Sequence, residues 1–135
     1  PRIIDCADTA EVLARTLEAA QAFRASGRKT LGILHASEEL AARYAELLSR
    51  DVEVHLLTVQ SATFHDGVSV ASVKMAKGLE FDHVVVPDAS ARVFPGDDLS
   101  RRRLYTTISR ATRRVDVLAK GPLTPLLDGF GKETS

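Results

Sequence analysis

Short apolar runs without an interrupting charge recur along the chain, and they restrict its fold more than any other feature. Leu31–Leu34 is one such run, and three successive valines at 84–86 form another. Short, continuous runs of this kind are typical of parallel strands buried on both faces of a sheet. Further strands are predicted at 52–57, 68–73, 83–86 and 114–119, after a short apolar start at Ile3 and Ile4. Strands that alternate with helices of ten or more residues predict an α/β sandwich with a mostly parallel sheet.

The helical stretches between these runs have recognisable ends. Asp8, with Glu11 three residues later, is typical of an N-cap with a capping box, and Ser26-Gly27 ends the helical spacing that follows. Ser37 is expected to cap a second helix, whose apolar stripe runs to Leu48. We also predict an exposed Pro-, Gly- and Asp-rich loop at 87–98, a helix at 99–111 and a short terminal helix at 123–130.

The composition limits the classes of function. Lys plus Arg and Asp plus Glu are 18 each, so the net charge is zero and any nucleic-acid contact has to be local. The apolar runs are far shorter than the roughly 20 residues that span a bilayer, so no membrane partner is expected. Cys6, the single cysteine, is expected to be buried; it permits no internal disulfide and no cysteine-based zinc site, and it suits a cytoplasmic protein.

The length of 135 residues fits one domain with one core, so we treat 1–135 as a single domain. The chain starts at Pro1 and its only methionine is Met75, and we therefore expect it to be a segment of a longer protein. His55, His65 and His83 have no spacing typical of metal ligands, and no metal site is predicted.

Two stretches imitate parts of a nucleotide site. Gly27-Arg28-Lys29-Thr30 lacks the first glycine of a phosphate loop, because Ala22 occupies that position, and it precedes a strand instead of following one. Asp88 follows the valine run as a magnesium-binding acid would, but no second acid comes after it, and a loop role is favoured. The chain is therefore predicted to lack its own phosphate loop and cannot hold a triphosphate and its metal alone.

The stretch 77–81 combines groups that suit the edge of a ligand site. Gly78 permits a positive φ and a close approach of the backbone to a ligand. Glu80 stands between two apolar residues that are expected to be buried, where a carboxylate is costly unless it accepts hydrogen bonds, for example from a ribose hydroxyl. The alternative is a tight turn whose Lys77 and Glu80 face water.

The stretch 104–111 places Arg110 on a predicted helix with apolar neighbours. A guanidinium is permanently charged and forks onto phosphate oxygens, which suits it to neutralising a transferring phosphoryl group. An ordinary salt bridge is the alternative. Arg101, Arg102 and Arg103 are interpreted mainly as a solvated face, with contacts to phosphate or to an acidic partner as the other possibility.

These residues resemble a known family. The run 76–82 with the valine strand resembles motif V of the UvrD/Rep helicases in superfamily 1, and 104–111 resembles their motif VI, with Val93-Phe94-Pro95 like the element between them. The resemblance covers about 31–118. It implies a three-layer RecA-like fold and the second, C-terminal motor domain of an ATP-dependent DNA helicase or translocase. ATP with Mg²⁺ would then be bound mainly by an N-terminal RecA-like domain of the same longer chain.

The resemblance also implies roles for single residues. Arg110 would be the arginine finger, Glu80 the ribose contact, and Gly78 and Lys77 part of the nucleotide site. His35 falls where a base-stacking residue of motif IV stands, whereas Ala36 replaces the arginine that follows it. The residues that would touch single-stranded or partly duplex DNA are Ser72 and Lys74.

Three hypotheses follow. In the first, the chain is half of a motor, inactive alone, in which Gly78, Glu80 and Arg110 converge at the carboxyl ends of strands or on the neighbouring helix. In the second, suggested by Ala36 and the zero net charge, it is a docking module with weak or no unwinding. Asp82 and the tail 120–123 resemble the HelD-like branch, some of whose members act on RNA polymerase. The third is a free-standing ATP-binding domain.

Overall fold

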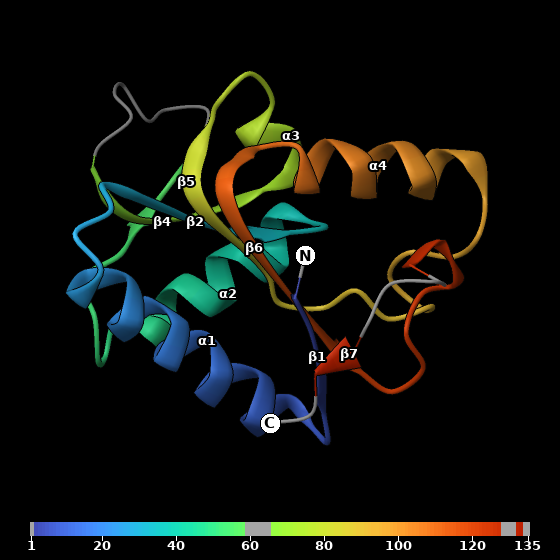
Figure 1. Cartoon of the computed structure of the whole chain (residues 1–135), viewed down its shortest axis with the longest axis horizontal. Helices are drawn as coiled ribbons and strands as arrows, with labels where there is room; N and C mark the ends of the chain where they lie inside the picture. Colours follow the sequence, from blue (N-terminus) through green and yellow to red (C-terminus); the bar gives the residue numbers. More distant parts are fainter. Residues whose placement is uncertain (1, 59–65, 128–131, 134–135) are drawn as a thin grey trace.

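The computed structural model describes residues 2–58, 66–127 and 132–133. It is a sandwich of three layers, in which helices cover both faces of a central sheet (Figure 1). The strand order is β3-β4-β2-β5-β6-β1-β7, and all neighbouring strands are parallel. The predicted α/β class and parallel sheet are therefore confirmed. The strands are β1 (Arg2–Cys6), β2 (Thr30–His35), β3 (His55–Leu56), β4 (Gly67–Ser72), β5 (Phe81–Val86), β6 (Ala111–Lys120) and β7 (Lys132–Glu133).

Four helices and one 3-10 turn complete the described fold. They are α1 (Thr9–Ala25), α2 (Glu38–Leu48), α3 (Val73–Ala76), α4 (Asp98–Ile108) and η1 (Pro125–Leu127). The predicted caps are confirmed, because the Asp8 side chain accepts from the Glu11 amide and the Ser37 hydroxyl accepts from the Leu40 amide. The cap of α4 is Asp97, whose carboxylate accepts from the Ser100 amide at 2.7 Å. Each longer helix thus begins where a short polar side chain satisfies an amide of its first turn.

Two hydrophobic layers lie on opposite faces of the sheet. Successive strand residues point to opposite faces, so Ile4 and Val85 pack with α1 and α2, while Ile3 and Val84 pack toward α3 and α4. Cys6 is buried, as predicted. In Figure 1, α1 and α2 run below the sheet and α3 and α4 above it. No helix among the described residues is long and apolar enough to cross a membrane.

Several predicted bounds are wrong. In 52–57, only His55–Leu56 is a strand, and Val73 begins α3 instead of ending β4, because the Ser72 hydroxyl accepts from the Met75 amide and starts a helical turn. The helix predicted at 99–111 ends at Ile108, and β6 begins at Ala111. The terminal helix at 123–130 is a single 3-10 turn at Pro125–Leu127, and 128–130 lie outside the described residues.

The two stretches that imitate a nucleotide site are ordinary turns. Gly27, with φ of 77°, ends α1 ahead of β2, so the segment has the reverse order of a phosphate loop. Asp88 follows β5, and its carboxylate accepts from the Ser90 amide at 3.0 Å, which is a turn contact. Both predictions are confirmed. His65 lies outside the described residues, and no group of His, Cys, Asp or Glu side chains in the described part could hold a metal ion.

Candidate functional site

The segments 77–82 and 104–111 meet where β5 and β6 begin. The Phe81 amide donates to the Arg110 carbonyl at 2.7 Å, and Phe81 pairs with Ala111 in the sheet. Glu80 therefore lies directly beside the backbone of Arg110. The two segments therefore meet through their backbones, whereas the convergence of the Gly78, Glu80 and Arg110 groups on one ligand stays a prediction. The predicted edge is wrong, because residues 73–80 carry the chain from the end of β4 back to the amino edge of the parallel sheet before β5 begins.

The turn before β5 has an open, positive-φ glycine. Gly78 has φ of 86°, and a Cβ placed there would meet no atom within 4 Å. The turn is closed by a hydrogen bond from the Leu79 amide to the Ala76 carbonyl at 2.9 Å. Glu80 and Lys77 are exposed, which agrees with the alternative of a tight turn whose charged side chains face water; of the two apolar neighbours expected to be buried, Phe81 is buried and Leu79 is half-buried. An exposed carboxylate next to open backbone leaves room for a ligand.

Arg110 lies beyond the end of α4 rather than on it. Ser109 is the C-cap, since its amide donates to the carbonyls of Thr107 and Tyr105. The half-buried Arg110 donates from Nε to the Thr106 carbonyl at 3.2 Å and from Nη2 to the Ser109 hydroxyl at 3.4 Å. Within the described part of the chain it forms no ion pair. The guanidinium therefore has no carboxylate that neutralises it.

Asp82 holds the start of β5 against the start of β2. Its carboxylate accepts from the amides of Lys29 at 2.8 Å and Thr30 at 3.4 Å, and its own amide donates to the Thr30 hydroxyl at 2.9 Å. The hydrogen bond from the Lys29 amide is the main reason that the pKa of Asp82 lies below its usual value. Sequence reasoning treated Asp82 only as a family variant. One sequence feature could have pointed to this role. Asp82 is a carboxylate at the second residue of a buried strand, two residues after Glu80.

A cavity of about 450 Å³ lies between α3 and α4. Its lining holds four cationic side chains and one acidic side chain, Glu38; the cations are Lys74, Lys77, Arg102 and Arg103. Ser72, Val73, Ala36 and Thr106 complete it. Two predicted nucleic-acid residues, Ser72 and Lys74, thus lie together. Lys77, which the resemblance assigned to the nucleotide, lines this cavity, whereas Gly78, Glu80 and Arg110 do not.

His35 is placed differently from its predicted role. It is 4% exposed, and its ring packs on Tyr44 with centroids 4.4 Å apart. Burial lowers its pKa to about 4, so the imidazole is neutral, and its Nε2 has no hydrogen-bond partner. The structure therefore offers no exposed imidazole face on which a base could stack. The next residue, Ala36, does line the cationic cavity.

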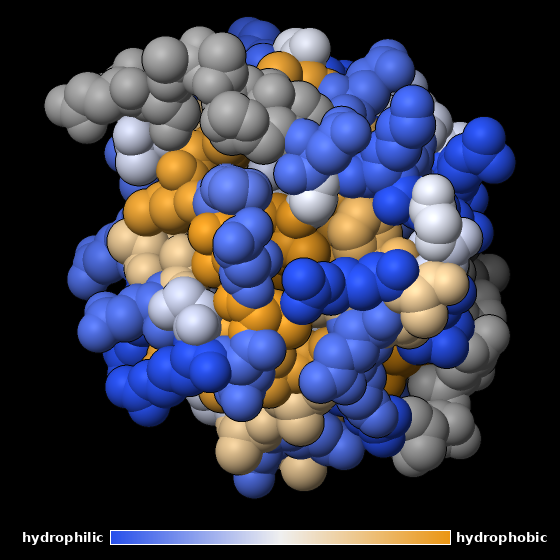
Figure 2. Space-filling model, turned by 90° about the vertical axis from the view of Figure 1, so that its left-hand side faces the viewer, coloured by the Kyte–Doolittle hydropathy of each residue, from blue (hydrophilic) through white to orange (hydrophobic). Residues whose placement is uncertain are grey.

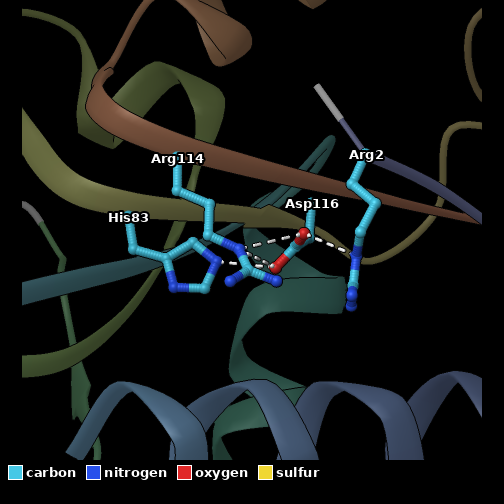
Figure 3. Close-up of polar contacts among 4 residues, drawn as sticks. All are labelled: Arg2, His83, Arg114 and Asp116. Atoms are coloured by element: carbon cyan, nitrogen blue, oxygen red, sulfur yellow. Dashed lines mark hydrogen bonds and ion pairs between the residues drawn. The ribbon is translucent and has the colours of Figure 1, made fainter. Parts of the chain in front are cut away.

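A second polar cluster lies on the α1 face of the sheet (Figure 3). Asp116 is 2% exposed and accepts from His83 Nε2 at 2.7 Å, from Arg114 Nε at 3.2 Å and from Arg2 Nε at 3.1 Å. Burial acts to raise the pKa of Asp116, but the hydrogen bond and charge of His83 and the charges of both arginines outweigh it, so the pKa is lowered. These contacts join side chains of β1, β5 and β6. We interpret the cluster as structural.

Comparisons with known proteins agree with this geometry. Residues 67–118 match the model of the UvrD-like helicase C-terminal domain. Among solved structures, the chain is similar to the C-terminal domain of a possible DNA helicase from Lactobacillus plantarum WCFS1, with 25% identity and a TM-score of 0.85 over 99% of this chain and 84% of that one. No curated protein matches the chain.

More distant structures share the fold. The C-terminal domain of the DEAD-box protein Dbp5 is 14% identical with a TM-score of 0.68, over 98% of this chain and 87% of that one. The UvsW helicase from bacteriophage T4 is 11% identical with a TM-score of 0.65, over 99% of this chain and 54% of that one. These two likenesses show the fold alone, an α/β domain of the kind found in the C-terminal domains of helicases.

Proposed function

We propose that this chain, as the C-terminal RecA-like domain of a UvrD-like helicase, supplies the arginine finger Arg110 to an ATP site shared with an N-terminal motor domain of the same longer protein. The observation that carries the proposal is the 2.7 Å hydrogen bond from the Phe81 amide to the Arg110 carbonyl. It holds the candidate ribose contact, Glu80, next to the candidate finger. Two motifs that are separate in sequence thus meet in space, as one side of a shared nucleotide site requires.

The residues on this side suit a bound nucleotide. Arg110 has only neutral oxygen partners in the described part of the chain, so its charge is available to phosphate oxygens. Open backbone at Gly78 and the exposed Glu80 carboxylate suit close approach and hydrogen bonding of a ribose. ATP with Mg²⁺ would supply the transferring phosphoryl group. The N-terminal motor domain would bind most of the ATP and its metal ion. When the two domains close, the Arg110 guanidinium would come close to the phosphoryl group and stabilise the negative charge that develops on it in the transition state.

The nucleic-acid side of the proposal rests on Ser72 and Lys74. Ser72 is 2% exposed and ends β4, where its hydroxyl oxygen accepts from the Met75 amide. Because a hydroxyl can donate and accept at once, its proton remains for a phosphate oxygen. Lys74 is exposed at the cavity between α3 and α4. We assign single-stranded or partly duplex DNA to this surface.

The test is the ATPase rate of the longer protein that contains this domain. Arg110→Ala is expected to lower the rate on the order of a thousandfold, because a finger acts on transition-state charge. Arg110→Lys keeps the charge but loses the fork, and is expected to recover only part of the rate. Arg101→Ala is the control, since Arg101 is exposed and pairs with Asp98 at 3.5 Å. An Arg110→Ala rate within about twofold of wild type would refute the finger.

The 135-residue chain alone is expected to hydrolyse no ATP and to bind it weakly, because it holds one side of the site. Calorimetry on the chain measures this directly. Micromolar binding of ATP by the chain alone would contradict a shared site and favour a free-standing nucleotide domain.

A docking module of the HelD-like kind, which binds RNA polymerase and unwinds little, is the second candidate. Ala36 favours it, since no phosphate-binding side chain stands there. Few apolar groups are available for docking in the described part, where the exposed large hydrophobic residues are Leu40, Leu99 and Tyr105. On the face in Figure 2, hydrophobic areas lie between hydrophilic side chains. Co-purification of RNA polymerase with the longer protein, and strand binding that hardly changes with salt, would favour this candidate.

A further inference from the structure

We propose that Arg102 and Arg103 of α4 bind phosphates of the nucleic-acid strand in the cavity between α3 and α4. The proposed nucleic-acid site, called the strand site below, would then extend from Ser72 and Lys74 onto α4, the helix that precedes Arg110. This inference rests on the proposed function, because it takes DNA as the ligand. It assigns a binding role to two arginines that sequence reasoning left mainly as a solvated face.

The first support is an excess of positive charge. Lys74, Lys77, Arg102 and Arg103 share one cavity of about 450 Å³ with the single acid Glu38. None of the four cations has an ion-pair partner within the described ranges 2–58, 66–127 and 132–133. The chain as a whole has zero net charge, so the excess is local. Like charges gathered at one cavity repel one another, and an anion that enters would relieve this repulsion.

Arg101, the neighbouring residue in α4, differs from Arg102 and Arg103 in its contacts. It is exposed, does not line the cavity, and pairs with Asp98 one helical turn earlier. Arg102 and Arg103 lack such a partner in the described part of the chain and reach the cavity wall instead. Among the described residues, α4 thus carries one arginine with an ion pair next to two without one, although the charge of Arg103 also acts on Asp97 and helps to lower its pKa.

The second support is the kind of anion that fits. A guanidinium forks onto phosphate oxygens, and Ser72 and Thr106 add hydroxyl donors to the lining. A row of cations with donors matches the backbone of a strand, which carries one charge per nucleotide. The apolar lining consists of Ala36 and Val73, so the cavity has no aromatic wall for a nucleotide base. Strand phosphates are therefore favoured over a mononucleotide.

Lys77 belongs to the nucleic-acid site in this proposal, and not to the nucleotide site. The resemblance places it in the nucleotide site, but its side chain lines the same cavity as Lys74 and Arg102. Gly78 and Glu80, which precede the Phe81 amide that donates to the Arg110 carbonyl, are not part of that lining. We infer that Lys77 also contacts the strand. The boundary between strand site and nucleotide site then falls between Lys77 and Gly78.

The test measures how the binding of a fluorescein-labelled oligothymidylate changes with KCl, by anisotropy, for the 135-residue chain and for the longer protein. Each phosphate contact on a single strand contributes about 0.7 to the slope of log K against log salt. Arg102→Gln with Arg103→Gln is expected to reduce the slope by about 1.4 and to weaken binding at low salt. Arg101→Gln, on the same helix, is expected to keep the wild-type slope. Circular dichroism melting checks that both variants fold.

Equal slopes for the double variant and Arg101→Gln would overturn the inference. Displacement of the oligonucleotide by polyglutamate of equal charge would also overturn it and point to an acidic protein surface. Competition by ATP at equal charge would assign the cavity to the nucleotide instead. If the wild type binds no strand while Arg110→Ala abolishes ATPase, the inference fails and the finger stands. If the slope depends on Arg102 and Arg103 while Arg110→Ala leaves ATPase unchanged, the reverse holds.

Discussion

Gly32 packs against the ring of Phe81 in the layer that supports the site. Gly32 lies in β2, and a Cβ at this position would stand 2.8 Å from two carbons of the Phe81 ring and 2.9 Å from a third. Ordinary carbon contacts lie at about 3.5–4.0 Å, so the ring would have to move by about 1 Å. Phe81 is 1% exposed, and its amide and carbonyl are bonded to Arg110 and Thr112, so the ring has little freedom to move.

Gly32→Ala is therefore expected to destabilise the fold. Overpacking of this kind costs about 1–3 kcal/mol. Gly32 has no positive φ, so alanine fits its backbone and regains about 0.4–1 kcal/mol through the unfolded chain. We expect a net loss of about 1–2 kcal/mol in the free energy of unfolding. Because the ring would be displaced next to Arg110, the ATPase rate of the longer protein should fall as well.

Urea unfolding of the single and double variants measures the effect. Phe81→Leu shortens the side chain beneath Gly32, so Gly32→Ala should cost little in that background, and the two changes should be strongly non-additive. Gly96→Ala is the matched control, because its Cβ would meet only Pro125, at 3.3 Å. Additive effects, or a Gly32→Ala midpoint equal to that of wild type, would refute the reasoning.

Two further predictions concern buried polar groups. Asp116→Ala is expected to cost about 1–3 kcal/mol, because the buried His83 Nε2 loses its acceptor, while the half-exposed Arg2 and Arg114 lose one ion pair each. Since the pKa of Asp116 is lowered, its stabilisation is present above its usual value of 3.8 and is lost as pH falls below it, which urea unfolding against pH would show. His35, with a pKa lowered from 6.5 to about 4, should cost about 3 kcal/mol of stability as pH falls through that window. His35→Phe should remove this dependence, and an unchanged pH profile would contradict it.

The sequence was sufficient wherever a short-range rule decides the structure. Asp8 and Ser37 cap helices because each side chain satisfies an amide three residues later, and that contact depends on local spacing alone. The buried strands at 31–34 and 83–86 follow from their continuous apolar character. That the segments of Glu80 and Arg110 meet was predictable only through the family resemblance. Spacing does not state which strands become neighbours.

Other features of the site depend on contacts between segments that are distant in the sequence, so the sequence did not predict them. Whether Glu80 is buried depends on which side of the β5 start faces the core, and Phe81 takes that side against Gly32. The clamp of Asp82 on Lys29 and Thr30 joins residues more than fifty positions apart, so no local pattern reveals it. Pairing likewise decides that Arg101 is compensated while Arg102 is not. The composition gives the number of charged residues, but it does not tell which of them form ion pairs.

The two proposed sites are joined by two short segments of chain, and this has a consequence for mechanism. Residues 73–80 run from Ser72, at the carboxyl end of β4, to the amino end of β5, and α4 ends at Ile108, two residues before Arg110. Both segments end at one hydrogen bond, from the Phe81 amide to the Arg110 carbonyl. If the two proposals hold, a nucleic-acid strand that pulls on α3 or α4 would act on the backbone that carries Glu80 and Arg110. Coupling between strand and nucleotide needs no long pathway here, because one backbone contact belongs to both.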